Sequence, residues 1–300
     1  RNIIKFSVNR FGSVFTFSDS LYKLITENDG YTQKLTSDDL TVYEYNTTLL
    51  TKENVEVIAN NDSTTLEKSK DYKVTLDDRQ SDTSWSRFTY EISPENFTED
   101  GTYTLRISSK DSASITSQTV DYDVCSATFR VDSTPADIIS VNYSTEVNKI
   151  AGHDGGAAKA EKLDINFTVE DLIRLEKVEV YVDNKLQNTY VYGKDFDDFN
   201  TFDGGVITLN RSSNEQSVRI VATDKAGNVI DTDDEKNYDP GYVFFNNITV
   251  TTNQLVIWAK SPVFWAIVGA VVLAGGGLVF FILLKRRKKD DEEEPTAQVE

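Results

Sequence analysis

The stretch from Ser217 to Asp231 reads SVRIVATDKAGNVID, and it decides the fold expected for the region around it. Apolar residues stand at every second position from Val218, so they share one face of a strand. In the centre, Asp224 can bond to the backbone of its own turn, while Gly227 and Asn228 tolerate left-handed φ. Strand, tight turn and strand together predict a β-hairpin.

Short alternating or β-branched runs of the same kind recur along the chain. Before Asp132 they are KFSV, SVFTF, TVYEY, VEVIA, YKVTL, RFTYEI, TYTLRIS and CSATFRV. After it they are DIISV, DINFTV, KVEVYV, NTYVY, VITL, SVRIVAT, NVID and FFNNITV. Turn residues such as Asn, Asp and Gly close these runs, and no long helical period interrupts them. The sequence therefore predicts an all-β fold of two β-sandwiches in tandem.

A proline-containing segment separates the two groups of strands. Pro135 cannot donate to a β-ladder and favours an extended residue before it, so a domain boundary is expected here. The expected organisation is a first sandwich over residues 1–132 and a second over 133–252, followed by a juxtamembrane stalk (253–261), a transmembrane helix (262–284) and a tail (285–300).

Two motifs carry a resemblance to known proteins. Residues 99–105, EDGTYTL, resemble the entry to strand F of immunoglobulin-like domains, in which the residue matching Tyr103 closes a corner by bonding to upstream backbone. Residues 219–229 resemble the ATDxAGN hairpin of bacterial immunoglobulin-like repeats on Gram-positive cell surfaces, which supports structural roles for Asp224 and Gly227. Residues 9–15 are similar to segments of large clostridial-type surface proteins. The resemblance implies immunoglobulin-like domains of a secreted, membrane-tethered surface protein, and it does not imply an enzyme.

An apolar segment near the C-terminus predicts an anchor in the lipid bilayer. From Val263 to Leu284 there is no charged residue, and as a helix this segment would be about 33 Å long, close to the thickness of bilayer hydrocarbon. Trp258 and Trp265 flank its start, where indole rings favour the membrane interface. Because no charge lies inside it, most channel, transport or proton-relay roles are excluded for this single helix.

The charges around this segment predict its orientation. Five basic residues follow it directly: Lys285, Arg286, Arg287, Lys288 and Lys289. By the positive-inside rule the short tail is cytoplasmic, and the preceding residues are extracellular at the cell membrane of a single-pass protein. Ala266, Ala270 and Ala274 also recur every fourth residue, which leaves weak dimerisation through this helix open.

Composition excludes several classes of function. The chain has 31 basic and 49 acidic residues and a formal net charge of −18, so it is expected to repel phosphate backbones and not to bind nucleic acid. Its single histidine, His153, lies among glycines, and its single cysteine, Cys125, lies on the apolar face of a strand. Neither forms a catalytic set, so no catalytic residue or cofactor is expected. No secretory signal follows Arg1, so an extracellular protein is expected to have further sequence before it.

The acidic aromatic loop GKDFDDFNTFDGG, residues 193–205, is the remaining candidate for a binding site. Asp197, Asp198, Asn200 and Asp203 are weak candidates for calcium ligands, since calcium needs six to eight converging oxygens and no closing glutamate follows. The favoured function is a non-catalytic, membrane-proximal stalk that spaces and presents a more N-terminal region. The alternative is an adhesin-like module that binds an extracellular glycan or protein through this loop, with or without calcium.

Overall fold

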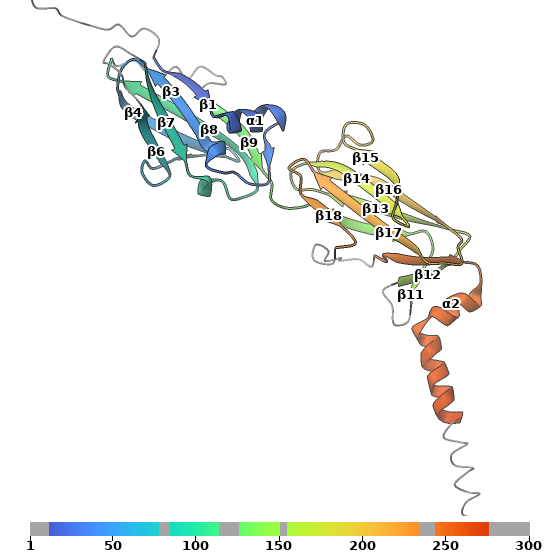
Figure 1. The fold of residues 1–300 in the computed structure, drawn as a ribbon. Coiled ribbons are helices and arrows are strands. Elements are labelled where there is room, and N and C mark those ends of the chain that lie inside the picture. The colour runs from blue at the N-terminus through green and yellow to red at the C-terminus, as the bar shows by residue number, and fades with distance from the viewer. Residues whose placement is uncertain (1–11, 78–84, 114–125, 151–154, 235–243, 276–300) are drawn as a thin grey trace, which may run out of the picture.

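The computed structural model describes residues 12–77, 85–113, 126–150, 155–234 and 244–275, and within them strands dominate. Figure 1 shows two β-sandwiches that follow each other along the chain, with helices leaving the far end of the second one. An all-β sandwich fold is therefore observed, as the sequence predicts. The runs and residues that fall outside the described ranges are KFSV, residues 9–11, Cys125, His153, residues 276–284 and Lys285–Lys289.

The first sandwich consists of a four-stranded and a five-stranded sheet. The four-stranded sheet has the order β1 (Val14–Phe17), β3 (Thr41–Asn46), β7 (Ser86–Ile92) and β6 (Tyr72–Asp77). The five-stranded sheet has the order β2 (Tyr31–Thr32), β9 (Ser126–Val131), β8 (Gly101–Asp111), β4 (Leu50–Ala59) and β5 (Asp62–Thr65). With β8 as strand F, these orders match the ABED and CFG sheets of immunoglobulin-like domains.

The core of the first sandwich follows from the alternation of its strands. In β8 every second residue is buried, and Tyr103, Leu105 and Ile107 face the opposite sheet. The rings of Phe97 and Tyr103 meet edge to face, with their centroids 5.3 Å apart. The Tyr103 hydroxyl donates to the carbonyl oxygen of Glu99 over 2.7 Å, four residues upstream. This bond holds the chain at its entry into β8.

A short helix joins the two sheets of this sandwich, and the sequence pattern did not predict it. Helix α1 (Asp19–Glu27) starts at Ser18, whose hydroxyl oxygen accepts a 3.1 Å hydrogen bond from the amide of Leu21. Leu21 is fully buried, and Leu24 and Ile25 pack against the same core. Two 3-10 turns, η1 (Asp38–Leu40) and η2 (Pro94–Asn96), complete the first sandwich.

The second sandwich consists of a three-stranded and a seven-stranded sheet. One sheet has the order β10 (Asp137–Tyr143), β13 (Lys162–Glu170) and β16 (Thr201–Asn210). The other has the order β11 (Val147–Lys149), β12 (Gly155–Lys159), β19 (Asn247–Thr251), β17 (Gln216–Asp224), β14 (Leu175–Val182) and β15 (Lys185–Val191), and β18 (Val229–Asp231) pairs with β17. In both sandwiches one strand pair is parallel, β2 with β9 and β12 with β19. Residues 172–174 form no helical turn and lead directly into β14.

Side chains pack closely in the core of the second sandwich. Val218, Ile220 and Ala222 of β17 are all fully buried, so the alternation in this strand does point its apolar face inward. On the other sheet, a Cβ atom at Gly205 would lie 2.2 Å from the ring of Phe167, so only glycine lets that ring pack over β16.

The second sandwich ends on a docked helix. Helix α2 (Gln254–Lys260) lies in the predicted stalk and packs against β12 and β19, and its Ile257 is buried with Ile150 and Ala157. The ammonium group of Lys260 also lies 3.1 Å from a carboxylate oxygen of Glu215. The stalk is therefore a packed element of the second sandwich.

A further helix follows α2 with a sharp bend. In the described part of the chain, no single helix is long and apolar enough to cross a bilayer, but α2 and the helix Pro262–Gly275 meet the length and composition test as a pair bent by 74°. Trp258 and Trp265 are each 56% exposed, and the indole N–H of Trp265 donates to the carbonyl of Ala259 over 2.7 Å.

Candidate functional site at the domain junction

Three buried aspartates meet where the two sandwiches join. Asp132 directly follows β9 of the first sandwich, Asp171 directly follows β13 of the second, and Asp224 is the last residue of β17. One carboxylate oxygen from each lies within 4.8 Å of one from each of the others. We call these three residues the junction triad. Strand ends from two sandwiches thus bring together carboxylates that lie far apart in the sequence.

Asp171 is held by the loop that it starts. Its Oδ1 accepts hydrogen bonds from the amides of Ile173 (2.8 Å) and Arg174 (2.6 Å), which orients the carboxylate as the chain turns toward β14. Its Oδ2 is buried and has no hydrogen-bond partner. The loop therefore fixes one oxygen and leaves the other buried without a hydrogen-bond partner.

Asp224 is held in the same way by the hairpin turn. Its Oδ1 accepts from the amides of Gly227 (2.7 Å) and Asn228 (2.8 Å), the turn bonding that the sequence favours. Gly227 has a φ of +94°, the left-handed conformation that suits glycine, whereas Asn228 does not adopt a positive φ and acts through its side chain. The Asn228 amide donates to Oδ2 of Asp224 (2.6 Å) and to the carbonyl of Asp132 (2.8 Å). This turn therefore ties the second sandwich to the linker.

Asp132 differs from the other two because no hydrogen bond of normal geometry reaches its carboxylate in the described structure, and only the nearby backbone amide of Thr134 acts to lower its pKa by hydrogen bonding. The residue is 0% exposed, and neither Oδ1 nor Oδ2 takes part in a hydrogen bond of normal geometry. Its backbone amide donates to the carbonyl of Thr32 over 2.9 Å, which continues the pairing of β2 with β9. A carboxylate desolvated without a partner is costly, so this side chain requires a counterpart.

Electrostatic repulsion within the triad is strong. Burial, together with the charges of Asp171 and Asp224, raises the pKa of Asp132 to about 7. Burial also raises the pKa values of Asp171 and Asp224. Two unit charges 4.8 Å apart repel by about 3 kcal/mol at an effective dielectric constant of about 20. The triad can relieve this repulsion only by taking up protons or a cation.

Lys225 and Arg174, close in sequence to Asp224 and Asp171, form their ion pairs in the described structure with acidic residues outside the triad. Lys225 lies 3.6 Å from Asp29 of the first sandwich and 3.5 Å from Glu176. Arg174 lies 3.7 Å from Glu176, and its guanidinium group sits over the ring of Tyr31, 5.5 Å from the centroid. These contacts bridge the two sandwiches around the triad without pairing with it.

The predicted loop lies beside this junction but arranges its polar groups differently from a calcium loop. Oδ1 of Asp198 accepts from the amides of Asn200 (2.9 Å) and Thr201 (3.0 Å), and Oδ1 of Asp203 accepts from the Thr168 hydroxyl. The Asn200 side chain donates to the carbonyls of Asp171 and Leu172. Asp197 is exposed. The structure does not bring the loop's acids together, and among the described acidic, His and Cys residues only the junction triad forms such a group.

The aromatic residues of this loop divide into buried and exposed ones. Phe202 is buried in the core, and Phe196 packs against it with ring centroids 5.1 Å apart. Phe199 is 52% exposed and stacks on Tyr192 at 5.1 Å, with the guanidinium of Arg174 4.7 Å from the Tyr192 ring centroid. Phe199 and Tyr192 thus form an aromatic surface next to the junction.

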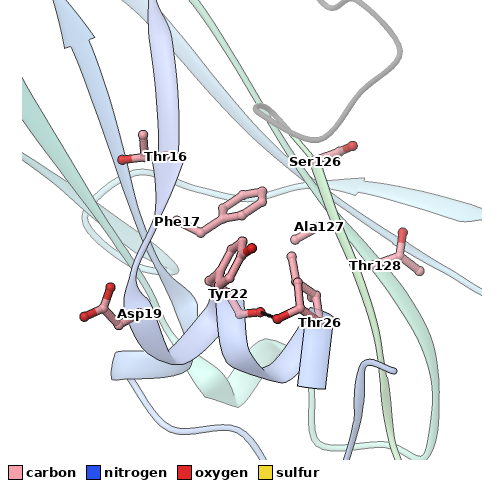
Figure 2. A pocket seen from close by; sticks show the side chains of 9 residues that line it. Thr16, Phe17, Asp19, Tyr22, Thr26, Ser126, Ala127 and Thr128 are labelled. Atoms are coloured by element: carbon pink, nitrogen blue, oxygen red, sulfur yellow. Dashed lines mark hydrogen bonds between the residues drawn. The ribbon is translucent and has the colours of Figure 1, made fainter. Parts of the chain in front are cut away.

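A separate hollow of about 750 Å³ lies on the first sandwich between α1, β1 and β9. Figure 2 shows Phe17, Tyr22 and Ala127 facing one another across it. Of the nine lining residues only Asp19 carries a charge, and the others are apolar or carry hydroxyl groups. This lining offers no pair of groups for acid and base catalysis.

Sequence reasoning missed Asp132 and Asp171 as partners of Asp224. Each was visible as an acidic residue at the end of a predicted strand, at one end of its sandwich. That signal becomes informative only when the two sandwiches are placed end to end, because Asp132 comes from one and the other two come from the next.

Comparisons with known proteins leave the family open. No family model matches the sequence, and no curated protein matches it. Among solved structures, the chain is similar to the fibronectin(III)-like modules of Clostridium thermocellum CbhA, at 10% identity over 73% of this chain and 87% of that one, with a TM-score of 0.23. It is also similar to Bacteroides ovatus SGBP-B of a mixed-linkage glucan utilization locus, solved in complex with a mixed-linkage heptasaccharide, at 14% identity over 70% of this chain and 42% of that one, with a TM-score of 0.17. At these TM-scores neither likeness carries an argument, and the fold rests on the strand order described above.

Proposed function

We propose that this chain is the non-catalytic, membrane-proximal stalk of a single-pass surface protein, which spaces and presents a more N-terminal region. One observation carries the proposal: both ends of the second sandwich are held by packed contacts. At one end, Asn228 and Lys225 bond to the first sandwich, and at the other Ile257 and Lys260 dock α2. A spacer needs such contacts, because flexible joints would let the presented region fold back toward the membrane.

The anchor and its orientation belong to the same proposal. The apolar segment begins directly after the docked helix α2, and the basic run Lys285–Lys289 would keep the tail in the cytoplasm. Trp258 and Trp265 would then lie at the outer interface of the bilayer. The alanines at 266, 270 and 274 support weak dimerisation of this helix.

A labelling experiment tests the topology. The chain is produced in cells with a cleavable secretion signal before Arg1, and its native cysteine is removed by Cys125→Ser. One variant then carries Thr64→Cys on exposed β5, and a second variant carries Thr296→Cys in the tail. We expect a membrane-impermeant maleimide to label position 64 on intact cells and position 296 only after permeabilisation. A chain truncated after Ser261 should appear in the medium. Labelling of position 296 on intact cells, or release of the full chain into the medium, would contradict the proposal.

The exposed aromatic surface of Phe199 and Tyr192 favours a second function, an adhesin-like module. The exposed Phe199 ring, stacked on the half-buried Tyr192 beside a guanidinium, suits contact with a sugar ring or a protein side chain. A glycan array probed with the full chain and with Phe199→Ala tests this function. Binding that Phe199→Ala abolishes would favour the adhesin, whereas no binding on the array leaves only the stalk function supported.

A further inference from the structure

We infer that the junction triad of Asp132, Asp171 and Asp224 is a binding site for a hard divalent cation, with Ca²⁺ as the preferred ion. The inference does not depend on the proposed function, because an ion at this junction would serve a spacer and an adhesin equally. It also places the ion away from the loop residues Asp197, Asp198, Asn200 and Asp203, which are the calcium candidates in the sequence.

The first argument is the supply of unsatisfied ligand atoms. Both carboxylate oxygens of Asp132 and Oδ2 of Asp171 are buried without a hydrogen-bond partner, and the residues are 0% and 3% exposed. Oδ2 of Asp224 has only the Asn228 amide as a partner. One carboxylate oxygen from each residue lies within 4.8 Å of one from each of the other two, so one cation can contact all three side chains. Buried carboxylates in such a group need either protons or a metal ion.

The second argument is that two ligands are already oriented. In Asp171 and Asp224 one oxygen is fixed by two backbone amides each, while the other oxygen has no partner in Asp171 and is bonded by the Asn228 side chain in Asp224. A cation would therefore find these two ligands in place. The third ligand, Asp132, belongs to the linker, and its carbonyl is held by Asn228.

The third argument concerns the identity of the ion. The triad offers only oxygen ligands, which suit Ca²⁺ and Mg²⁺ rather than the softer Zn²⁺ or Cu²⁺. Ca²⁺ accepts six to eight oxygens in irregular geometry and tolerates bidentate carboxylates, whereas Mg²⁺ demands a near-ideal octahedron. The two free oxygens of Asp132 permit bidentate contact, and water can complete the shell. Sites of this kind in extracellular modules bind Ca²⁺ with dissociation constants of roughly 10⁻⁴ to 10⁻³ M.

An ion in this position would fix the angle between the sandwiches. It would join a linker residue of the first sandwich to two loops of the second, alongside the contacts of Lys225 with Asp29 and of Arg174 with Tyr31. Loss of calcium would leave three mutually repelling carboxylates at the joint, so the joint would loosen.

Calorimetric titration of the full chain in detergent micelles with CaCl₂, and in parallel with MgCl₂, tests the inference. The wild type should take up one Ca²⁺ with a dissociation constant of about 10⁻⁴ to 10⁻³ M and bind Mg²⁺ at least tenfold more weakly. Asp132→Asn should weaken Ca²⁺ binding at least tenfold. The matched control is Asp197→Asn, which removes the same charge from an exposed residue and should bind Ca²⁺ like the wild type.

Thermal unfolding gives a second readout that a purely structural role would not reproduce. With chelator present, Asp132→Asn should unfold at a higher temperature than the wild type, because it removes the repulsion from Asp171 and Asp224 and breaks no hydrogen bond of normal geometry. Calcium should raise the unfolding temperature of the wild type and of Asp197→Asn but not of Asp132→Asn. Asp171→Asn provides an independent variant in the second sandwich. No saturable Ca²⁺ binding by the wild type, or equal loss of the calcium response in Asp132→Asn and Asp197→Asn, would overturn the inference.

Discussion

At the scale of single residues, the Tyr103 hydroxyl shows how one hydrogen bond holds a corner of the first sandwich. Tyr103 is 5% exposed and donates to the Glu99 carbonyl over 2.7 Å. Tyr103→Phe keeps the ring but leaves that carbonyl without its donor, so we expect the free energy of unfolding to fall by about 1–2 kcal/mol. Urea unfolding of the wild type and of Tyr103→Phe, each as the full chain in detergent, measures this change in the free energy of unfolding.

The control for this variant is Tyr22→Phe, since Tyr22 is 60% exposed. Its free energy of unfolding should stay within about 0.5 kcal/mol of the wild type, as is usual for surface substitutions. Equal losses in the two variants would mean that the corner bond contributes nothing specific.

Glu44 should give the first sandwich a distinct pH dependence. It is fully buried, and its carboxyl accepts hydrogen bonds from the hydroxyls of Ser13, Ser109 and Tyr90. Burial raises the pKa of Glu44 above the value of 4.5 for a free glutamate, although these hydroxyls oppose the shift. Folding therefore favours the protonated carboxyl. Its stabilising contribution is fully present below about pH 4.5 and is lost as the pH rises through the folded pKa.

Thermal unfolding of the full chain from pH 4.5 to 7.5 measures this contribution. The unfolding temperature of the wild type should decline with pH more steeply than that of Glu44→Gln, whose amide does not titrate. The exposed Glu91 provides the control Glu91→Gln, which should keep the slope of the wild type. Parallel slopes for the wild type and Glu44→Gln would show that Glu44 does not titrate in this range.

Residue-level chemistry was partly predictable. The bonding of Asp224 to its turn follows from local sequence, because donor and acceptor are at most four residues apart. The proximity of Asp224 to Asp132 and Asp171 does not follow from local sequence, because it depends on how two separate sandwiches are joined. The proposed calcium ligands thus lie outside the loop where spacing alone suggested them.

At the scale of elements, helix α1 depends on its cap. The Ser18 hydroxyl accepts from the amide of Leu21 (3.1 Å) and donates to the carbonyl of Asp38 (2.8 Å), so one side chain starts the helix and attaches it to η1. Ser18→Ala should lower the free energy of unfolding by about 1–2 kcal/mol in urea unfolding of the full chain. Ser37→Ala is the matched control, because Ser37 occupies the same position before η1 without a side-chain capping bond. A loss in Ser37→Ala as large as in Ser18→Ala would contradict this account.

Elements were predictable where alternation was long. The runs in β3, β7 and β8 alternate over six or more residues, and each was expected as a strand. Strand β5 was missed because all four of its residues are polar and exposed, so no apolar face marks it. Helix α1 was missed although Leu21, Leu24 and Ile25 recur at helical spacing after Ser18, because nine residues give only a brief period.

At the scale of the whole molecule, the junction decides whether two sandwiches act as one spacer. The net charge of −18 opposes any close approach, so the contacts that bridge the junction must hold the sandwiches together against this repulsion. The tandem order of the sandwiches was predicted from the strand count and the Pro135 segment. The packing of α2 onto the second sandwich was not, since Ile257 gains its apolar partners Ile150 and Ala157 only in the folded chain.

The most direct test of a fixed junction is the distance between the two sandwiches, measured by pulsed electron paramagnetic resonance on the full chain in detergent. Spin labels at Thr64→Cys on β5 and Lys185→Cys on β15, in a Cys125→Ser background, report on one sandwich each. We predict one narrow distance distribution in millimolar calcium and a broader one after chelation. A broad distribution under both conditions would contradict the claim that the sandwiches form a stiff spacer.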